Sequence, residues 1–292
     1  MSVKTHNKTK LVPVNRSVAL LPERDASISP ILECIDLGVT FGGLKAVDNF
    51  DITIGRTEIA GLIGPNGAGK TTFFNCVTGI YKPTEGTVHL YGANGEKHLL
   101  NGRKPHLITA LGMARTFQNI RLFSDMTVLE NVMIGRHCRT KAGIWGALTR
   151  NPATRREEQE SIDISYSLLE TVHLQDLWNE KACNLAYGAQ RRLEIARALM
   201  TDPKILLLDE PVAGMITTEL EEMAQLVVQI RQDFNVSIIM IEHHMNFVMP
   251  IADRIKVVDF GKTISEGAPD VVQKDPKVIE AYLGGGYQNV NA

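Results

Sequence analysis

Apolar residues form short continuous runs in two regions of the chain and fall into helical spacing between those regions. Three of the runs are EIAGLI at 58–63, ILLLD at 205–209 and SIIMIE at 237–242. Such runs are typical of strands that are covered on both faces, as in a parallel sheet. Between about residues 127 and 181, apolar positions recur at steps of three or four, which indicates helices. The pattern predicts an α/β core with a helical insertion in its middle.

The same pattern predicts where the folded part begins and how the later helices are oriented. Residues 1–29 are polar and unpatterned, which predicts a flexible tail. Strand-like runs at 51–54 and 87–91, with glycines between them, predict a small β region near the start of the fold. Thr218 and Glu221 resemble a capping box, so a helix is expected to begin there. Two apolar stripes flank the run at 205–209, one of Leu193, Ala196 and Leu199 and one of Leu220, Met223, Val227 and Ile230.

The segment GPNGAGKTT, residues 64–72, lies between a predicted strand and a predicted helix, which is the context of a phosphate-binding P-loop. Gly64, Gly67 and Gly69 permit backbone angles that point several N–H groups into one hollow. Lys70 can reach the β- and γ-phosphates of a nucleotide, and the Thr71 hydroxyl can bind Mg²⁺. The predicted nucleotide contacts are Gly64, Asn66, Gly67, Ala68, Gly69, Lys70, Thr71 and Thr72.

A second acidic motif completes this hypothesis. The apolar run at 205–209 ends at Asp209, where a carboxylate would hold Mg²⁺ through water. Glu210, one residue later, is placed to polarise the water that attacks the γ-phosphate, as a general base. Alone, a strand that ends in Asp-Glu would indicate only a capped turn. Beside a P-loop, it predicts a single nucleotide site for ATP and Mg²⁺.

Three further segments follow in a fixed order, and they narrow the class of P-loop protein. They are RTFQN with Phe117 and Gln118, NLAYGAQRRLEIARAL at 184–199, and IEHHM at 241–245. No NKxD guanine reader of the GTPase type is present. The order resembles the nucleotide-binding subunits of ABC transporters over nearly all of residues 30–285. Within that family, the likeness is closest to the ATPase subunits of bacterial branched-chain amino acid importers.

The resemblance implies a domain organisation. Residues 30–285 would form one ABC ATPase domain, an α/β P-loop core with a mainly parallel sheet and an N-terminal antiparallel β subdomain. A helical subdomain at about 119–189 would be inserted in this core, and residues 286–292 would be a C-terminal tail. The implied activity is ATP hydrolysis coupled to transmembrane transport.

The resemblance also implies roles for single residues. Phe41 would stack on adenine, His243 would contact the γ-phosphate, and Gln118 would link the Mg²⁺ and water region to a permease. In the head-to-tail dimer of this family, the γ-phosphate bound by the opposite subunit would meet Leu185, Ala186, Tyr187 and Gly188. The residues alone leave non-functional alternatives open: Phe41 as a core residue, Gln118 as a surface residue and His243 as a structural residue. His244 receives no role.

Composition limits the partners and the location. The 31 basic and 33 acidic residues nearly cancel, which argues against a general nucleic-acid binder. The four cysteines are far apart in the sequence, so a reducing cytosol is expected. No apolar run approaches the roughly 20 residues that cross a bilayer. We therefore expect a peripheral protein on the cytoplasmic face of the inner membrane, bound there only through permease subunits and paired with a second ATPase subunit.

Two departures from the family pattern qualify this interpretation. The usual signature LSGGQ reads LAYGA here, with Ala189 in place of the glutamine, and an expected polar residue after the acidic strand is Ile216. The preferred function is the ATPase of an importer for branched-chain or other small amino acids. A lipid or lipopolysaccharide exporter ATPase, or an ATP-binding subunit with weak turnover, stays open. An ABC-type DNA-repair or translation factor would need coiled-coil arms or a second cassette, and neither is visible.

Overall fold

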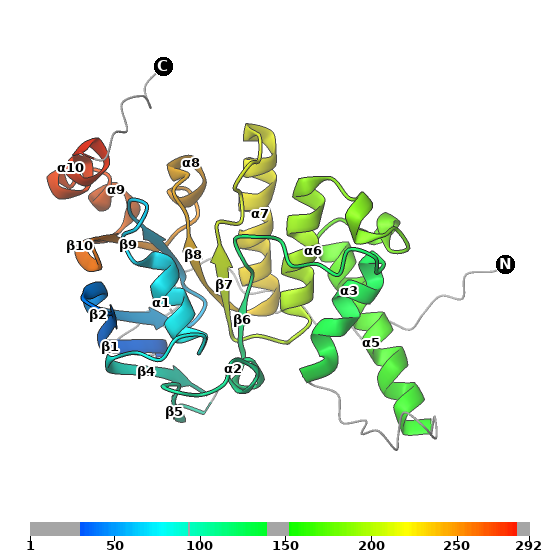
Figure 1. The fold of residues 1–292 in the computed structure, drawn as a ribbon. Helices are drawn as coiled ribbons and strands as arrows, with labels where there is room; N and C mark the ends of the chain where they lie inside the picture. Colours follow the sequence, from blue (N-terminus) through cyan, green and yellow to red (C-terminus); the bar gives the residue numbers. More distant parts are fainter. Residues whose placement is uncertain (1–29, 93, 139–151, 285–292) are drawn as a thin grey trace.

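The computed structural model of the chain describes residues 30–92, 94–138 and 152–284. Its centre is a six-stranded sheet of order β10-β9-β3-β8-β7-β6 (Figure 1). The bounds of these strands are β3 Ile59–Ile63, β6 Met113–Arg115, β7 Ile205–Asp209, β8 Ser237–Ile241, β9 Arg254–Asp259 and β10 Lys262–Gly267. All neighbouring pairs are parallel except β9–β10. The predicted α/β core with a mainly parallel sheet is therefore present.

A second sheet of four antiparallel strands, in the order β2-β1-β4-β5, packs on one side of the core. Its strands are β1 Pro30–Phe41, β2 Leu44–Gly55, β4 Glu85–Tyr91 and β5 Lys97–Leu99. The runs predicted at 51–54 and 87–91 lie within β2 and β4, which are both longer than the runs. The first half of β2 lacks the apolar pattern of a strand, but its backbone pairs with β1 as far as Phe41 and Leu44, next to the turn.

Helices cover both faces of the central sheet. Their bounds are α1 Lys70–Val77, α2 Pro105–Leu111, α3 Val128–Gly135, α5 Pro152–Thr171, α6 Tyr187–Leu199, α7 Thr217–Phe234, α8 Met245–Val248, α9 Pro269–Val272 and α10 Pro276–Gly284. Short 3-10 turns occupy Arg136–Cys138, Gln175–Leu177 and Ala182–Asn184. Between β6 and β7, helices α3, α5 and α6 pack against one another (Figure 1). The predicted helical insertion is thus found at this point of the chain, and the tails at 1–29 and 286–292 lie outside the described residues.

Alternation of side chains along each central strand divides the core into two layers. In β7, Leu206 and Leu208 face the layer that contains the apolar faces of α6 and α7. Ile205 and Leu207 face the layer that contains α1 and the antiparallel sheet. The continuous apolar run arises because both faces of the strand are buried, as the sequence predicts.

The start of α7 differs from the prediction. The helix begins at Thr217, and Ile216 occupies the N-cap position. Glu219, not Glu221, supplies the returning acceptor, because the Ile216 N–H donates to the Glu219 carboxylate at 3.1 Å. The predicted capping box at Thr218 and Glu221 is wrong by two residues, because the N-cap is Ile216 and the N3 residue is Glu219. Its predicted inward stripe holds: Met223, Val227 and Ile230 are buried and Leu220 packs against the core.

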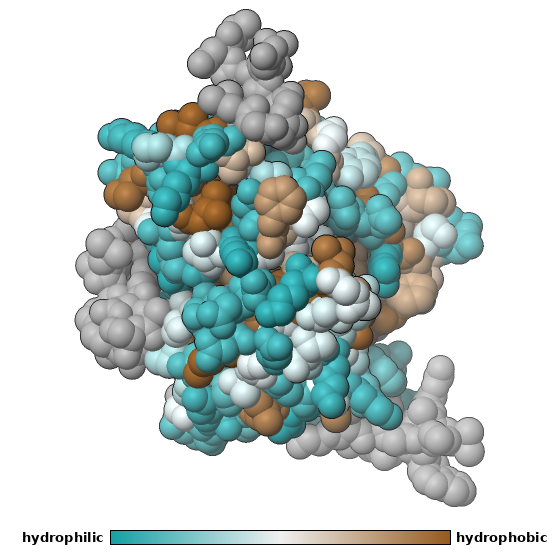
Figure 2. Space-filling model, turned by 60° about the vertical axis from the view of Figure 1, so that its left-hand side comes forward, coloured by the Kyte–Doolittle hydropathy of each residue, from teal (hydrophilic) through white to brown (hydrophobic). Residues whose placement is uncertain are grey.

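No helix among the described residues is both long and apolar enough to cross a bilayer. Figure 2 brings the left-hand side of Figure 1 forward and shows a mostly hydrophilic face in which apolar patches are small and separate.

Candidate active site

Strand order brings the four predicted motifs to one edge of the sheet. In the parallel strands, order β3-β8-β7-β6, the P-loop follows β3 and Glu210 follows β7. His243 follows β8 on one side of β7, and Gln118 follows β6 on the other. Carboxyl ends of parallel strands meet at a common edge, where ligands bind in open α/β sheets. Segments as far apart in sequence as residues 64 and 243 are neighbours for this reason.

The P-loop has the backbone conformation that its glycines permit. Gly69 has φ 100° and Gly67 has φ 81°, both in the left-handed region. A Cβ on Gly69 would lie 2.3 Å from the Ala46 carbonyl oxygen, so no side chain fits there. A Cβ on Gly67 would meet no atom within 4 Å, because this side of the loop is open. The loop is therefore open on the side of Gly67 and closely packed on the side of Gly69.

The remaining P-loop residues surround this hollow. Thr71 is exposed at the first turn of α1, and Thr72 is half-buried. Asn66 is exposed, whereas Ala68 is buried and its carbonyl accepts the Gly261 N–H at 3.0 Å. The Thr71 hydroxyl is thus free to face a ligand, while Ala68 anchors the loop to the β9–β10 turn.

The Lys70 ammonium lies folded against the P-loop itself. Its Nζ donates to the carbonyl oxygens of Gly64 at 2.7 Å and Pro65 at 2.8 Å. Burial lowers the pKa of Lys70 from its ordinary value, while the negative charges of Glu210 and Asp209 oppose that shift. The carboxylates favour the charged form, so the side chain stays available to pair with a phosphate that enters the hollow.

Glu210 is presented by a strained turn at the end of β7. Its φ is 49°, in a region that costs a non-glycine residue on the order of 1–3 kcal/mol. Its N–H donates to the Ile241 carbonyl of β8 at 2.9 Å, which fixes the turn. The carboxylate then lies between two polar groups: Gln118 Nε2 donates to Oε2 at 3.0 Å, and His243 Nδ1 is 3.8 Å from Oε1. The predicted catalytic trio thus meets at one carboxylate.

Asp209 is buried beside this carboxylate and is already paired on one oxygen. Its Oδ2 lies 2.6 Å from Arg115 Nη2, and both side chains are almost inaccessible, at 2% and 6% exposure. Burial raises the pKa of Asp209, and the hydrogen bond and charge of Arg115 oppose that shift. Its Oδ1 is buried without a hydrogen-bond partner in the described part of the chain. This orphaned oxygen and the exposed Thr71 hydroxyl are the hard oxygen donors that suit Mg²⁺, so the residues fit a magnesium ion.

Phe41 is the last residue of β1, directly before the turn to β2. Its side chain is 47% exposed, and its ring meets the edge of Tyr81 with centroids 5.3 Å apart. The exposure argues against the alternative of a core phenylalanine. An exposed aromatic pair offers a face on which a planar base can stack. Tyr81, which follows α1, was not among the residues predicted from the sequence.

The signature segment is at a helix start away from the P-loop. Ala186 is the exposed N-cap of α6, Tyr187 is 43% exposed, and Leu185 and Gly188 are buried. In Figure 1, strands of the central sheet separate α6 from α1. The first N–H groups of a helix have no partner within it and carry a partial positive charge. This end of α6 can meet an anion from outside, but not one held by its own P-loop.

A buried ion pair connects the signature helix to the segment of Gln118. Arg191 donates to the carbonyl oxygens of Phe117, at 2.7 Å, and of Gln118, and to the Tyr187 hydroxyl at 2.9 Å. Glu194, 3.3 Å from Arg191, accepts the Phe117 N–H at 3.2 Å. The backbone at Gln118 and the side chain of Tyr187 in the signature segment therefore both contact the buried guanidinium of Arg191.

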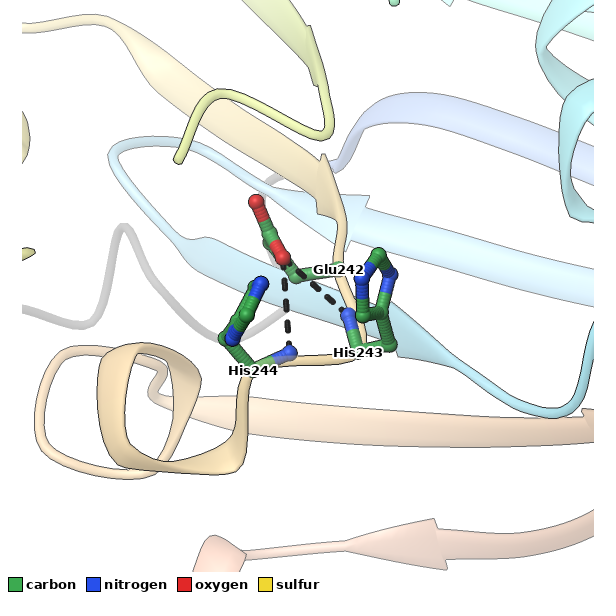
Figure 3. Close-up of side chains that lie close together, drawn as sticks. All are labelled: Glu242, His243 and His244. Atoms are coloured by element: carbon green, nitrogen blue, oxygen red, sulfur yellow. Dashed lines mark hydrogen bonds between the residues drawn. The ribbon is translucent and has the colours of Figure 1, made fainter. Parts of the chain in front are cut away.

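Glu242 holds the turns on either side of the site. Its side chain is fully buried, and its Oε1 accepts the Val212 N–H at 3.1 Å. Its Oε2 accepts the N–H groups of His243 at 3.1 Å and His244 at 3.4 Å, which Figure 3 shows converging on one carboxylate. Potential metal-ligand atoms of these three residues lie within 4.8 Å of one another. Because both oxygens of Glu242 already accept backbone N–H groups, the geometry favours a structural role.

Sequence reasoning missed Arg115, Arg191 and Glu242. Arg115 ends the strand Met113–Arg115, and a charge at the end of an apolar strand was its only signal. Arg191 and Glu242 lie inside motifs whose neighbouring residues drew attention. Each is buried and forms contacts with residues more than 25 positions away, which a single sequence does not show.

Comparisons with known proteins agree with this geometry. The sequence profile of the ABC transporter family matches residues 47–213, which contain the P-loop and the acidic strand. The chain belongs to the ABC transporter family. A second profile, for the branched-chain amino acid ATP-binding cassette transporter, matches residues 262–288. The resemblance drawn from the motif order is confirmed.

Individual relatives are similar over most of their length. The chain is 47% identical over 255 residues to the high-affinity branched-chain amino acid transport ATP-binding protein LivG of Salmonella typhimurium (strain LT2), covering 87% of this chain and 98% of that protein. It is 44% identical over 255 residues to BraF of Pseudomonas aeruginosa, another high-affinity branched-chain amino acid transport ATP-binding protein, with the same coverage of 87% and 98%.

Solved ATP-binding cassettes of ABC transporters share the fold. The ADP conformation of MJ1267 is similar with a TM-score of 0.75 at 32% identity, covering 87% of this chain and 99% of that one. A nucleotide-free cassette is similar with a TM-score of 0.74 at 30% identity, covering 87% and 98%. These likenesses confirm the predicted P-loop α/β fold.

The two departures from the usual ABC signature have different surroundings. Ile216 is 66% exposed at the start of α7, whereas Ala189, in the first turn of α6, is buried in the core with 8% exposure. Neither side chain can form a hydrogen bond with Lys70, Asp209 or Glu210, because both are apolar. The two departures therefore contribute no polar contact to these predicted site residues.

Replacing Ile216 with Asn is expected to stabilise this ABC domain by about 1 kcal/mol, because Asn at an N-cap accepts an N–H of the first turn. Ile216 already has the extended backbone of an N-cap, with φ −80° and ψ 165°, and its exposed side chain buries little. The free energy of unfolding in urea measures the gain. Thr218→Asn, inside the first turn, is the matched control and should give none. An unchanged midpoint for the Ile216 variant would contradict the assignment of the cap.

Proposed function

We propose that this chain is the ATP-binding and ATP-hydrolysing subunit that powers an importer of branched-chain amino acids. The observation that carries the proposal is the placement of Glu210 between Gln118 and His243, beside the P-loop and Asp209. The named activity of the LivG and BraF relatives supports the transported class. Residues 30–285 would act as one ABC ATPase domain, with its helical subdomain at about 119–189.

Binding would begin with the exchange of partners at Lys70. Its ammonium would leave the carbonyls of Gly64 and Pro65 for the β- and γ-phosphates of ATP, which the P-loop N–H groups and the start of α1 also attract. Asp209 and Thr71 would hold Mg²⁺, with Gln118 close to it. When bound, Mg²⁺ supplies positive charge to the phosphate oxygens. Adenine would stack on Phe41.

Hydrolysis would depend on the carboxylate of Glu210. It would accept a proton from the water that attacks the γ-phosphorus, as the bond to the ADP oxygen breaks. Its carboxylate accepts the Gln118 amide N–H, and its backbone has the strained left-handed conformation at the end of β7. His243, on the neighbouring strand, would contact the γ-phosphate and the water from the other side.

A second ATPase subunit would complete the site. The signature residues Leu185 to Gly188 lie at the start of α6, and strands of the central sheet separate this helix from α1 in Figure 1. In a head-to-tail pair, this end of α6 would meet the γ-phosphate held by the partner subunit. ATP would then join the two subunits and hydrolysis would separate them, which would move permease subunits between their two forms. The chain would act on the cytoplasmic face of the inner membrane.

A transport assay tests the assigned function directly. The full chain is assembled with its cognate permease subunits and binding protein in liposomes, with ATP supplied on the side of the ATPase. ATP-dependent accumulation of labelled leucine, isoleucine or valine is the expected result. ATP turnover that is stimulated by lipid, without uptake of any of these amino acids, would favour the alternative of an exporter. Purification of the permease that accompanies the chain from membranes supplies the components.

A further inference from the structure

The guanidinium of Arg115 is buried at the meeting point of three elements of the site. It ends β6, and its Nη2 pairs with Asp209 Oδ2 at the end of β7 at 2.6 Å. Its Nη1 donates to Asn75 Oδ1, on the P-loop helix α1, at 2.7 Å. Arg115 therefore connects the strand that leads to Gln118, the strand that leads to Glu210, and the helix that follows Lys70.

The pairing divides the two oxygens of the Asp209 carboxylate between different tasks. Arg115 occupies Oδ2, while Oδ1 is buried and has no hydrogen-bond partner in the described residues. A carboxylate can rotate about its Cβ–Cγ bond, so an anchor on one oxygen fixes the direction of the other. In this arrangement Oδ1 is the carboxylate oxygen left without a partner among the described residues.

Arg115 is itself held firmly. Its guanidinium carbon is 5.3 Å from the centre of the Phe74 ring and 5.2 Å from that of the Phe117 ring. The planar, permanently charged guanidinium can stack on rings while it donates in two directions, which a lysine ammonium cannot reproduce. The side chain that positions Asp209 is thus fixed by α1 on one side and by the residue before Gln118 on the other.

We propose that Arg115 is a positioning residue for magnesium, which directs Oδ1 of Asp209 to the metal and ties that direction to the P-loop helix through Asn75. The proposal rests on the proposed function. A purely structural ion pair would support the fold equally with and without the metal. A positioning residue acts on the part of ATP affinity that Mg²⁺ supplies.

The test measures ATP affinity of the full chain by calorimetry, once in excess Mg²⁺ and once in EDTA, in a Glu210→Gln background that prevents turnover. The Glu210→Gln protein with Arg115 intact should bind ATP more tightly in Mg²⁺ than in EDTA, and this ratio of affinities is the reference gain. Arg115→Gln should reduce that gain by about tenfold, as expected for the loss of one charged contact. Its affinity in EDTA should be unchanged. Arg115→Lys should give an intermediate gain, because one contact is retained.

Asn75→Ala provides a variant that leaves the ion pair in place and removes the amide contact between Arg115 and α1. Its gain from Mg²⁺ should fall by a smaller factor, about threefold. This variant decides the question if Arg115→Gln does not fold, as judged by its melting transition. An equal loss of affinity in Mg²⁺ and EDTA, or no loss in either, would overturn the proposal. Failure of the wild-type background to bind ATP in any condition would instead overturn the proposed function.

Discussion

Glu210→Gln is expected to reduce ATP turnover by a factor on the order of 10² to 10⁴ while ATP still binds, because the loss of a general base removes that much rate. The amide keeps the size of the side chain and a carbonyl oxygen for the Gln118 N–H that Glu210 accepts at 3.0 Å. It loses the charge that would take a proton from water. Phosphate release by the assembled transporter and ATP affinity of the full chain measure the two effects separately.

Glu221→Gln is the matched control for this change. Glu221 is exposed on α7, so the same chemical replacement there should leave turnover unchanged. A Glu210 variant that hydrolyses ATP at the wild-type rate would show that another group activates the water.

The same replacement, made in one subunit of the pair at a time, also tests whether Ala189 and Ile216 weaken the site to which they belong. Unequal activity of the two halves is expected if they do. Equal activity would remove the asymmetry.

Lys70→Ala should weaken ATP binding by roughly 10- to 150-fold, the range that corresponds to a hydrogen bond with a charged group of about 1.5–3 kcal/mol. The Lys70 side chain is buried, and its ammonium donates to the carbonyls of Gly64 and Pro65. Since it leaves those partners for phosphate oxygens on binding, its loss removes the one cation of the P-loop. Titration of the full chain with ATP in Mg²⁺ measures the change.

Lys104→Ala is the control for this loss of charge. Lys104 is exposed before α2 and lies outside the P-loop, so ATP affinity should not change. If the Lys70 variant bound ATP as tightly as the unaltered chain, the phosphate would be held by backbone groups alone. The assignment of Lys70 would then be wrong.

The chain's local pattern was sufficient for the architecture and for most of the candidate site. Apolar runs that lacked alternation predicted buried parallel strands, and β7 and β8 follow those runs closely. The P-loop could be predicted because the residues expected to contact phosphate are consecutive in the chain. Glycines at 67 and 69 and the following lysine are local requirements of backbone angle and charge, so spacing alone records them.

Boundaries and partner residues were harder to predict. The sequence placed the start of α7 at Thr218, because Thr and Glu three residues apart are a frequent signal. The chain instead enters the helix after Ile216, a residue with no capping side chain. Met223, Val227 and Ile230 lie in the helix interior with either start, so their apolar spacing predicts the buried face but not the first residue.

The sequence by itself determined that this protein has a P-loop, an acidic strand and the ordered motifs of an ABC ATPase, because each is a run of neighbouring residues. Only the tertiary structure decided which charged and polar side chains form ion pairs and hydrogen bonds with one another. The order β8-β7-β6 places His243 and Gln118 on either side of Glu210. It also brings Arg115 to Asp209, 94 positions away. Distance in the chain carries no information about such pairs, because strand order in the folded sheet sets them.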